Sequence, residues 1–122
     1  MVDDNPIDSE IFRKVVQSID ASVQVTFAVN GANAIDIVSK GKPDMIFLDS
    51  LMPIMDGIEC LTKLKANRNT RKIPVVLYTS SENATEHELA LRLGAFHLVR
   101  KSGNIEKLTG EIRQMISFAE AL

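Results

Sequence analysis

Residues 45–57 have the sequence Met-Ile-Phe-Leu-Asp-Ser-Leu-Met-Pro-Ile-Met-Asp-Gly. Four apolar residues lead directly into Asp49, and Pro53 and Gly57 mark the loop that follows. This pattern is typical of a buried strand that carries one carboxylate at its carboxyl end. Because ligands of open parallel sheets bind in the crevice outside those strand ends, we predict a chemical role for Asp49.

Strand and helix patterns alternate on both sides of this segment, as they do in βα units around a parallel sheet. The sequence therefore predicts a doubly wound α/β fold with five helices and a five-stranded parallel sheet. Besides residues 45–48, strand patterns occupy residues 23–29, 74–78 and 96–99. Helical patterns occupy residues 7–19, 34–38, 58–64, 85–93 and 105–119.

Some local features of the helices can also be predicted. In the first helix, the spacing places Ile7, Ile11, Val15 and Ile19 on the buried face. Residues 85–88, Thr-Glu-His-Glu, resemble a capping box for the fourth helix, whose apolar positions are Leu89 and Leu93. Asn104 is expected to cap the last helix.

The first strand is unusually short. Only Met1 and Val2 precede Asp3, whereas a typical strand has about five or six residues. A truncated central strand would leave unpaired backbone groups in both of its neighbours. We therefore expect that residues are missing upstream of Met1.

Bulk composition excludes several classes of function. The chain has 122 residues, which suits one domain, and a formal net charge of -2 without a basic stripe for nucleic acid. Its single cysteine, Cys60, cannot form an internal disulfide, and no apolar segment reaches membrane-spanning length. We expect a cytoplasmic protein that contacts neither nucleic acid nor membrane.

Acidic side chains follow two of the predicted strands. Asp3 and Asp4 end the first apolar segment, and Asp49 ends the segment before Ser50. Carboxylates from two loops that could converge suggest a site for a hard cation. A hard cation beside a free aspartate oxygen suggests phosphoryl chemistry.

These residues belong to an ordered set that covers essentially the whole chain. Residues 2–5 (Val-Asp-Asp-Asn), Asp49 with residues 52–57, Thr79 and Lys101 follow one another as in bacterial response-regulator receiver domains. The chain resembles that CheY-like family, and more loosely its small stand-alone regulators. The resemblance implies one receiver domain over residues 1–122, with the flavodoxin-like strand order 2-1-3-4-5.

The resemblance also implies what each matching residue does. Asp49 would accept a phosphoryl group from the histidine of a sensor kinase or a histidine phosphotransfer protein. Mg²⁺ would be held by Asp4 directly, by Asp3 through water, by Asp49 and by the backbone carbonyl of Leu51. Thr79 and Lys101 would bind phosphate oxygens. Such a domain is a signalling phosphoacceptor of a two-component system and not an enzyme, because it catalyses only its own Mg²⁺-dependent phosphoryl transfer and slow autodephosphorylation. The resemblance leaves open which downstream protein it binds and whether it forms a homodimer.

Two positions depart from the family pattern. Ser102 follows Lys101 where most receivers have a proline, and Leu98 occupies the place of an aromatic switch residue, for which Phe96 is a speculative substitute. These departures keep open an alternative function, a pseudo-receiver that binds partners without phosphorylation.

Two other classes fit less well. A phosphatase of the haloacid-dehalogenase type also uses a strand-end aspartate with magnesium, but it needs a second aspartate where this chain has Leu51. A flavodoxin-like flavin binder needs hydroxyl groups and glycines in its first loop to cradle phosphate. The acidic residues Asp3 and Asp4 would repel that phosphate instead.

Overall fold

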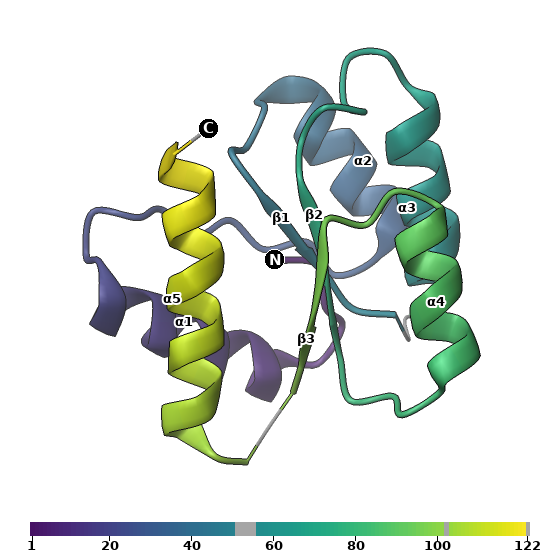
Figure 1. Cartoon of the computed structure of the whole chain (residues 1–122). Helices are drawn as coiled ribbons and strands as arrows, with labels where there is room; N and C mark the ends of the chain where they lie inside the picture. Colours follow the sequence, from purple (N-terminus) through teal and green to yellow (C-terminus); the bar gives the residue numbers. More distant parts are fainter. Residues whose placement is uncertain (51–55, 102, 122) are drawn as a thin grey trace.

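The computed structural model describes residues 1–50, 56–101 and 103–121 (Figure 1). Over these residues the helices are α1 (Pro6–Ile19), α2 (Gly31–Lys40), α3 (Gly57–Ala66), α4 (Ala84–Arg92) and α5 (Ile105–Ala121). The strands are β1 (Ile46–Leu48), β2 (Val75–Thr79) and β3 (His97–Arg100). Within this part of the chain, no helix combines the length and the apolarity that crossing a bilayer demands.

The sheet has the predicted parallel arrangement. Strand β2 lies between β1 and β3, with Phe47 opposite Val76 and Tyr78 opposite Val99. Val2 extends the sheet beyond β1, because it forms isolated parallel bridges to both Leu48 and Ala28. If the bridges at Ala28 and Val2 are counted as reduced strands, the order across the sheet is the Ala28 segment, the Val2 segment, β1, β2 and β3. Numbered along the chain, these five strands have the order 2-1-3-4-5, which confirms the predicted topology.

The first strand is as short as predicted, and the second is shorter than its sequence pattern indicated. Residues 23–29 form only the bridge at Ala28, although their polarity alternates as in a strand. A strand needs a neighbouring backbone to pair with, and the backbone beside residues 23–29 is that of Met1 and Val2. The Met1 amino group donates to the Thr26 carbonyl at 3.0 Å, and the Ala28 amide donates to the Met1 carbonyl at 2.9 Å.

Helices cover both faces of the sheet (Figure 1). Alternate residues of a strand point to opposite faces, so Leu48 and Leu77 pack with the α2 and α3 side, whereas Phe47 and Val76 pack with the α1 and α5 side. Strands β1 and β2 are therefore buried along their whole length. This explains the uninterrupted apolar runs that precede Asp49 and Thr79.

The buried face of α1 differs from the predicted stripe. Ile7 and Ile11 are 69% and 36% exposed, whereas Phe12, Val15 and Val16 are buried. The Phe12 ring packs at 4.8 Å from the Phe47 ring and 5.7 Å from the Tyr78 ring, measured between centroids. Helical spacing alone permits either stripe, and this aromatic contact with the sheet selects the one that contains Phe12.

The start of α4 also differs from the prediction. The cap is Asn83, whose side-chain oxygen accepts the Glu86 amide at 3.1 Å, so the capping box predicted at residues 85–88 is wrong. Leu89 is 44% exposed, and the neighbouring Ala90 is fully buried in its place. The predicted cap of α5 is confirmed, because the Asn104 side chain accepts the Lys107 amide at 3.1 Å.

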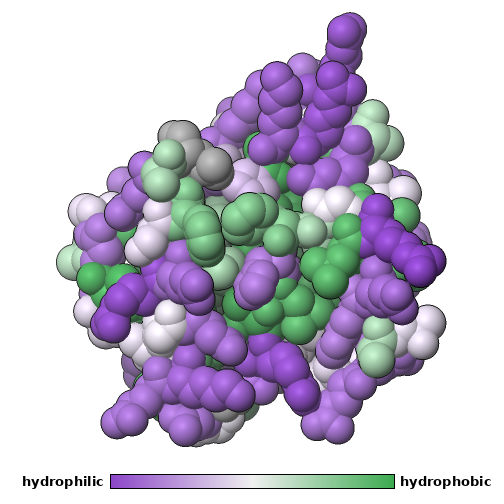
Figure 2. Space-filling view, in the orientation of Figure 1, coloured by the Kyte–Doolittle hydropathy of each residue, from purple (hydrophilic) through white to green (hydrophobic). Residues whose placement is uncertain are grey.

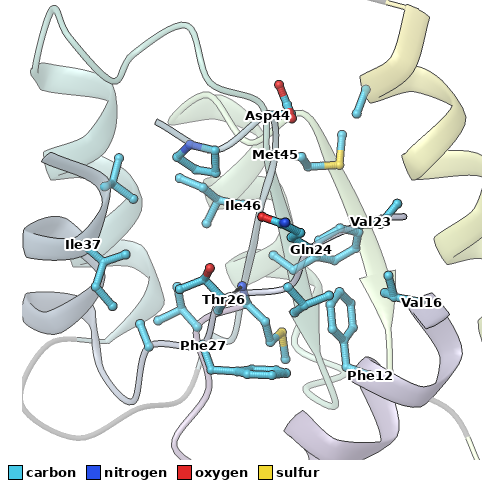
Figure 3. Close-up of a pocket in the computed structure, with 18 of the residues that line it drawn as sticks. Phe12, Val16, Val23, Gln24, Thr26, Phe27, Ile37, Asp44, Met45 and Ile46 are labelled. Atoms are coloured by element: carbon cyan, nitrogen blue, oxygen red, sulfur yellow. Dashed lines mark hydrogen bonds between the residues drawn. The ribbon is translucent and has the colours of Figure 1, made fainter. Parts of the chain in front are cut away.

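A cavity of about 820 Å³ lies beside the short first strand. Residues 22–28 line one side of it and residues 41–47 line the other. In Figure 3, Gln24, Thr26 and Phe27 lie on the first side, with Met45 and Ile46 near them. The cavity thus lies between the two segments that flank Val2 in the sheet.

Extending the chain by about five apolar residues ahead of Met1 is expected to raise the melting temperature. The added segment would pair with backbone groups on both sides of the cavity and bury apolar surface there. Thermal unfolding followed by circular dichroism measures the change. An extension of equal length made of glycine and serine is the control, and equal melting temperatures for the two would contradict the prediction.

Candidate functional site

The predicted site residues meet at the carboxyl edge of the sheet. Asp3 follows the Val2 bridge, Asp49 follows β1, Thr79 ends β2, and Lys101 follows β3. Backbone hydrogen bonds hold these strand ends in register, from the Asp49 amide to the Val2 carbonyl and from the Lys101 amide to the Thr79 carbonyl, both at 2.9 Å. The sheet topology therefore places side chains from four separate segments around one point.

Lys101 is the centre of the charge network. Its ammonium donates to Asp3 Oδ2 at 2.8 Å, to Asp8 Oδ2 at 2.9 Å and to Asp49 Oδ2 at 3.3 Å. The side chains of Lys101, Asp3 and Asp49 are only 14%, 0% and 8% exposed. Buried charges of this kind are tolerated when they are paired, and here one lysine pairs with carboxylates from three segments.

The charge state of Lys101 follows from these contacts. Burial alone would lower the pKa of Lys101, but hydrogen bonds to Asp3 and Asp8 and the charge of Asp49 outweigh it, so the pKa lies above its ordinary value. The ammonium also lies 5.4 Å from the centroid of the Tyr78 ring. Lys101 is therefore a fixed positive charge next to Asp49 at neutral pH.

Three carboxylates are close enough to share one cation. Asp3, Asp4 and Asp49 each offer an oxygen atom, and these atoms lie within 4.8 Å of one another. Asp3 and Asp49 are buried, whereas Asp4 is exposed and faces solvent. A sparse set of carboxylates with one open, solvated side is the kind of donor set that suits Mg²⁺, which keeps several of its own waters.

Thr79 lies at the same edge with a different set of contacts. It is fully buried, its Oγ1 is 2.6 Å from Ser50 Oγ, and it accepts the Ser81 amide at 3.0 Å. Ser50 is the residue directly after Asp49. A hydroxyl pair therefore connects the end of β2 to the segment that carries the central carboxylate.

Asp8 and Ser50 are members of the site that the sequence reasoning missed. Asp8 lies in the first turn of α1, where Asn5 caps the helix, and an acidic residue there suggests only a favourable interaction with the helix dipole. Ser50 carries no motif of its own. The one available signal was its position next to Asp49, and the contact with Thr79 depends on how two distant strands pair.

Four other positions were singled out in the sequence. Leu51, whose carbonyl was assigned to the cation by resemblance, and Ser102 lie outside the described residues. Leu98 is half-buried against the core. Phe96 is 43% exposed, and its ring makes an edge contact with the ring of Phe118 at 5.6 Å between centroids.

Comparisons with known proteins agree with this geometry. Residues 1–113 match the family model of the response regulator receiver domain. The chain is 32% identical over 111 residues to a protein-glutamate methylesterase/protein-glutamine glutaminase of Methanococcoides burtonii, which covers 89% of this chain and 31% of that protein. It also resembles the crystal structure of the phosphorylated cyanobacterial phytochrome response regulator RcpA, with a TM-score of 0.85 and 25% identity over 96% of this chain and 89% of that one. For the Mn²⁺-bound response regulator Rcp1, the TM-score is 0.75 and the identity 26%, over 96% of this chain and 89% of that one.

The match concerns one domain of larger proteins in many cases, because the chain spans between 21% and 52% of the length of the first curated relatives that it matches. The activities of those whole proteins are therefore not transferred to it. These relatives share the region that matches this chain, and residues 1–113 of the chain fall within the family model. By this match the chain belongs to the response regulator receiver domains of two-component systems.

Proposed function

We propose that this chain accepts a phosphoryl group on Asp49 from the phosphohistidine of a sensor histidine kinase or a histidine phosphotransfer protein. The observation that carries the proposal is the Lys101 ammonium, 3.3 Å from an Asp49 oxygen at the meeting point of the strand ends. An Asp49 oxygen attacks phosphorus, an O–P bond forms, and the N–P bond breaks with its electron pair returning to the imidazole. A carboxylate is a weak nucleophile, so neighbouring charges and in-line placement must supply most of the acceleration.

Mg²⁺ is the cofactor that the donor set fits. Asp4, Asp49 and, through water, Asp3 would hold it, together with the Leu51 carbonyl that the family resemblance adds. When bound, the ion would neutralise negative charge on the carboxylates and on the incoming phosphoryl group. The response regulator Rcp1, which this chain resembles, has a crystal structure of its Mn²⁺-bound form, which supports the proposal of a divalent cation here.

Lys101 and Thr79 are proposed to stabilise the modified state. The Lys101 ammonium would pair with one phosphoryl oxygen as a compact positive charge, and the Thr79 hydroxyl would donate to another. Phosphorylation adds about 1.5 to 2 negative charges, which shifts the equilibrium between arrangements of the loops around the site. In this proposal the chain turns over no separate substrate, and its output is an altered surface.

A separate apolar surface, at the amino end of β3 and near the carboxyl end of α5, is proposed as a place where a partner could bind. Phe96 and Phe118 are 43% and 44% exposed and contact each other. In the orientation of Figure 1, apolar surface gathers in the middle of the molecule with hydrophilic surface around it (Figure 2). The two partners to test at Phe96 and Phe118 are a downstream protein and a second copy of this chain.

Beryllium trifluoride, an analogue of the phosphoryl group, is expected to bind Asp49 when Mg²⁺ is present. A bound resonance in ¹⁹F NMR and shifted amide signals of Asp49 and Thr79 would report binding. Asp49→Asn should abolish both signals, because it removes the carboxylate oxygen that the analogue coordinates. Asp44→Asn is the matched control, since Asp44 is an exposed aspartate ahead of the same strand, and should leave them unchanged. Failure of the unaltered protein to bind with Mg²⁺ present would instead favour a pseudo-receiver that acts without phosphorylation.

A further inference from the structure

A buried pair of hydroxyl groups lies directly beside the proposed phosphoacceptor. Ser50 and Thr79 are 3% and 0% exposed, and their oxygens are 2.6 Å apart. Water does not reach groups buried to this degree, so each hydroxyl depends on protein partners. The described contacts of the Thr79 side chain are Ser50 Oγ and the Ser81 amide.

Backbone contacts fix both members of the pair. The Ser50 carbonyl accepts the Gly57 amide at 3.1 Å, and the Thr79 carbonyl accepts the Lys101 amide at 2.9 Å. The two hydroxyls therefore meet because the ends of β1 and β2 are held side by side. Their contact is a property of the sheet edge, and it links the residue after Asp49 to the end of β2.

We propose that Ser50 is a positioning residue that holds the Thr79 hydroxyl in the unphosphorylated state. This inference rests on the proposed phosphoacceptor function of Asp49. When a phosphoryl group is present, Thr79 exchanges its bond with Ser50 for a bond with a phosphoryl oxygen. Ser50 thus sets how readily the domain enters its modified state.

The energetic consequence can be stated as a direction. In the unaltered protein, forming the modified state breaks a buried hydrogen bond and leaves Ser50 without that partner, which opposes the change. Ser50→Ala removes this bond from the unmodified state only. The substitution leaves the Thr79 hydroxyl short of one partner until a phosphoryl oxygen arrives, so it favours the modified state.

Titration with beryllium trifluoride in excess Mg²⁺ tests the proposal on the full chain. Ser50→Ala is expected to tighten binding about threefold to tenfold, which corresponds to one buried hydrogen bond. Thr79→Ala should weaken binding, and the double variant should bind like Thr79→Ala alone, because Ser50 acts through Thr79. Ser80→Ala, at an exposed serine next to Thr79, is the matched control and should leave the affinity unchanged. If the alanine variant does not fold, Ser50→Cys is the second variant; its thiol is larger than the hydroxyl and a much weaker hydrogen-bond donor, so it is also expected to tighten binding.

The outcomes separate this inference from the function on which it rests. If the unaltered protein does not bind the analogue, the phosphoacceptor proposal and this inference both fall. If it binds, but Ser50→Ala binds equally or more weakly, only the inference is overturned. If Ser50 had a purely structural role, Ser50→Ala would lower the melting temperature without tightening binding. If the effects of the two substitutions on affinity added in the double variant, Ser50 would not act through Thr79.

Discussion

Replacing Gly57 by alanine is expected to destabilise the protein by about 3 kcal/mol or more, at the upper end of the cost of overpacking. A Cβ atom at this position would lie 2.3 Å from the Asp49 carbonyl oxygen and 2.6 Å from the Ser50 Cα. Both are backbone atoms at the end of a central strand, so neither can move aside as a flexible side chain could. The first residue of α3 must therefore be glycine for the helix to approach the segment that carries Asp49.

Gly110→Ala is the matched control for this substitution. Gly110 lies inside α5, and a Cβ atom added there meets nothing within 4 Å. Alanine in an open helical position is expected to stabilise the protein by about 0.5 to 1 kcal/mol relative to glycine. Urea denaturation of the two variants measures both free energies of unfolding. A loss below about 1 kcal/mol for Gly57→Ala would show that the segment after β1 can shift, against the argument from packing.

The order of elements was predictable because its signals are local. Period-two and helical apolar patterns lie within single segments, and the positions that end them, Asp49 and Thr79, fall at strand ends in the structure. Parallel strands bring their carboxyl ends to one edge, so the convergence of these residues with Lys101 followed from topology. In the sequence, Gly57 marked only the end of a loop, because its close contact with the strand depends on how a helix and a strand dock.

Other features depended on contacts between distant segments and could not be read from local patterns. The rotation of α1 is set by the contact of Phe12 with Phe47, which lies far along the chain. Asp8 enters the charge network only because Lys101 reaches it across a separation of 93 residues. The contact of Ser50 with Thr79 has the same origin. The cap of α4 is different, since Asn83 and the predicted box at residues 85–88 both have suitable residues, and the helix starts at the earlier one.

Lys101→Met is expected to destabilise the protein by about 3 to 5 kcal/mol in the absence of divalent cations, the usual cost of removing one partner from a buried ion pair. Methionine keeps a long, unbranched side chain beside Tyr78, so the main loss is charge. The carboxylates of Asp3 and Asp49 would remain buried without their shared ammonium. Because the pKa of Lys101 is raised above its ordinary value of about 10.4, its contribution is fully present below that pH and is lost only as pH rises through the higher value. A comparison at pH 7 therefore measures the full effect.

Mg²⁺ is expected to reverse part of this loss, because a cation bound by the same carboxylates replaces the missing positive charge. Binding to the folded state alone stabilises it by mass action, and the variant site carries more negative charge than the unaltered one. The gain in free energy of unfolding on adding Mg²⁺ should thus be larger for Lys101→Met than for the unaltered protein. Lys107→Met, at an exposed position in α5, should change stability by less than about 0.5 kcal/mol with or without the cation. An equal response to Mg²⁺ in Lys101→Met and Lys107→Met would mean that the lysine and the cation do not share the carboxylates, and the proposed metal site would have to be placed elsewhere.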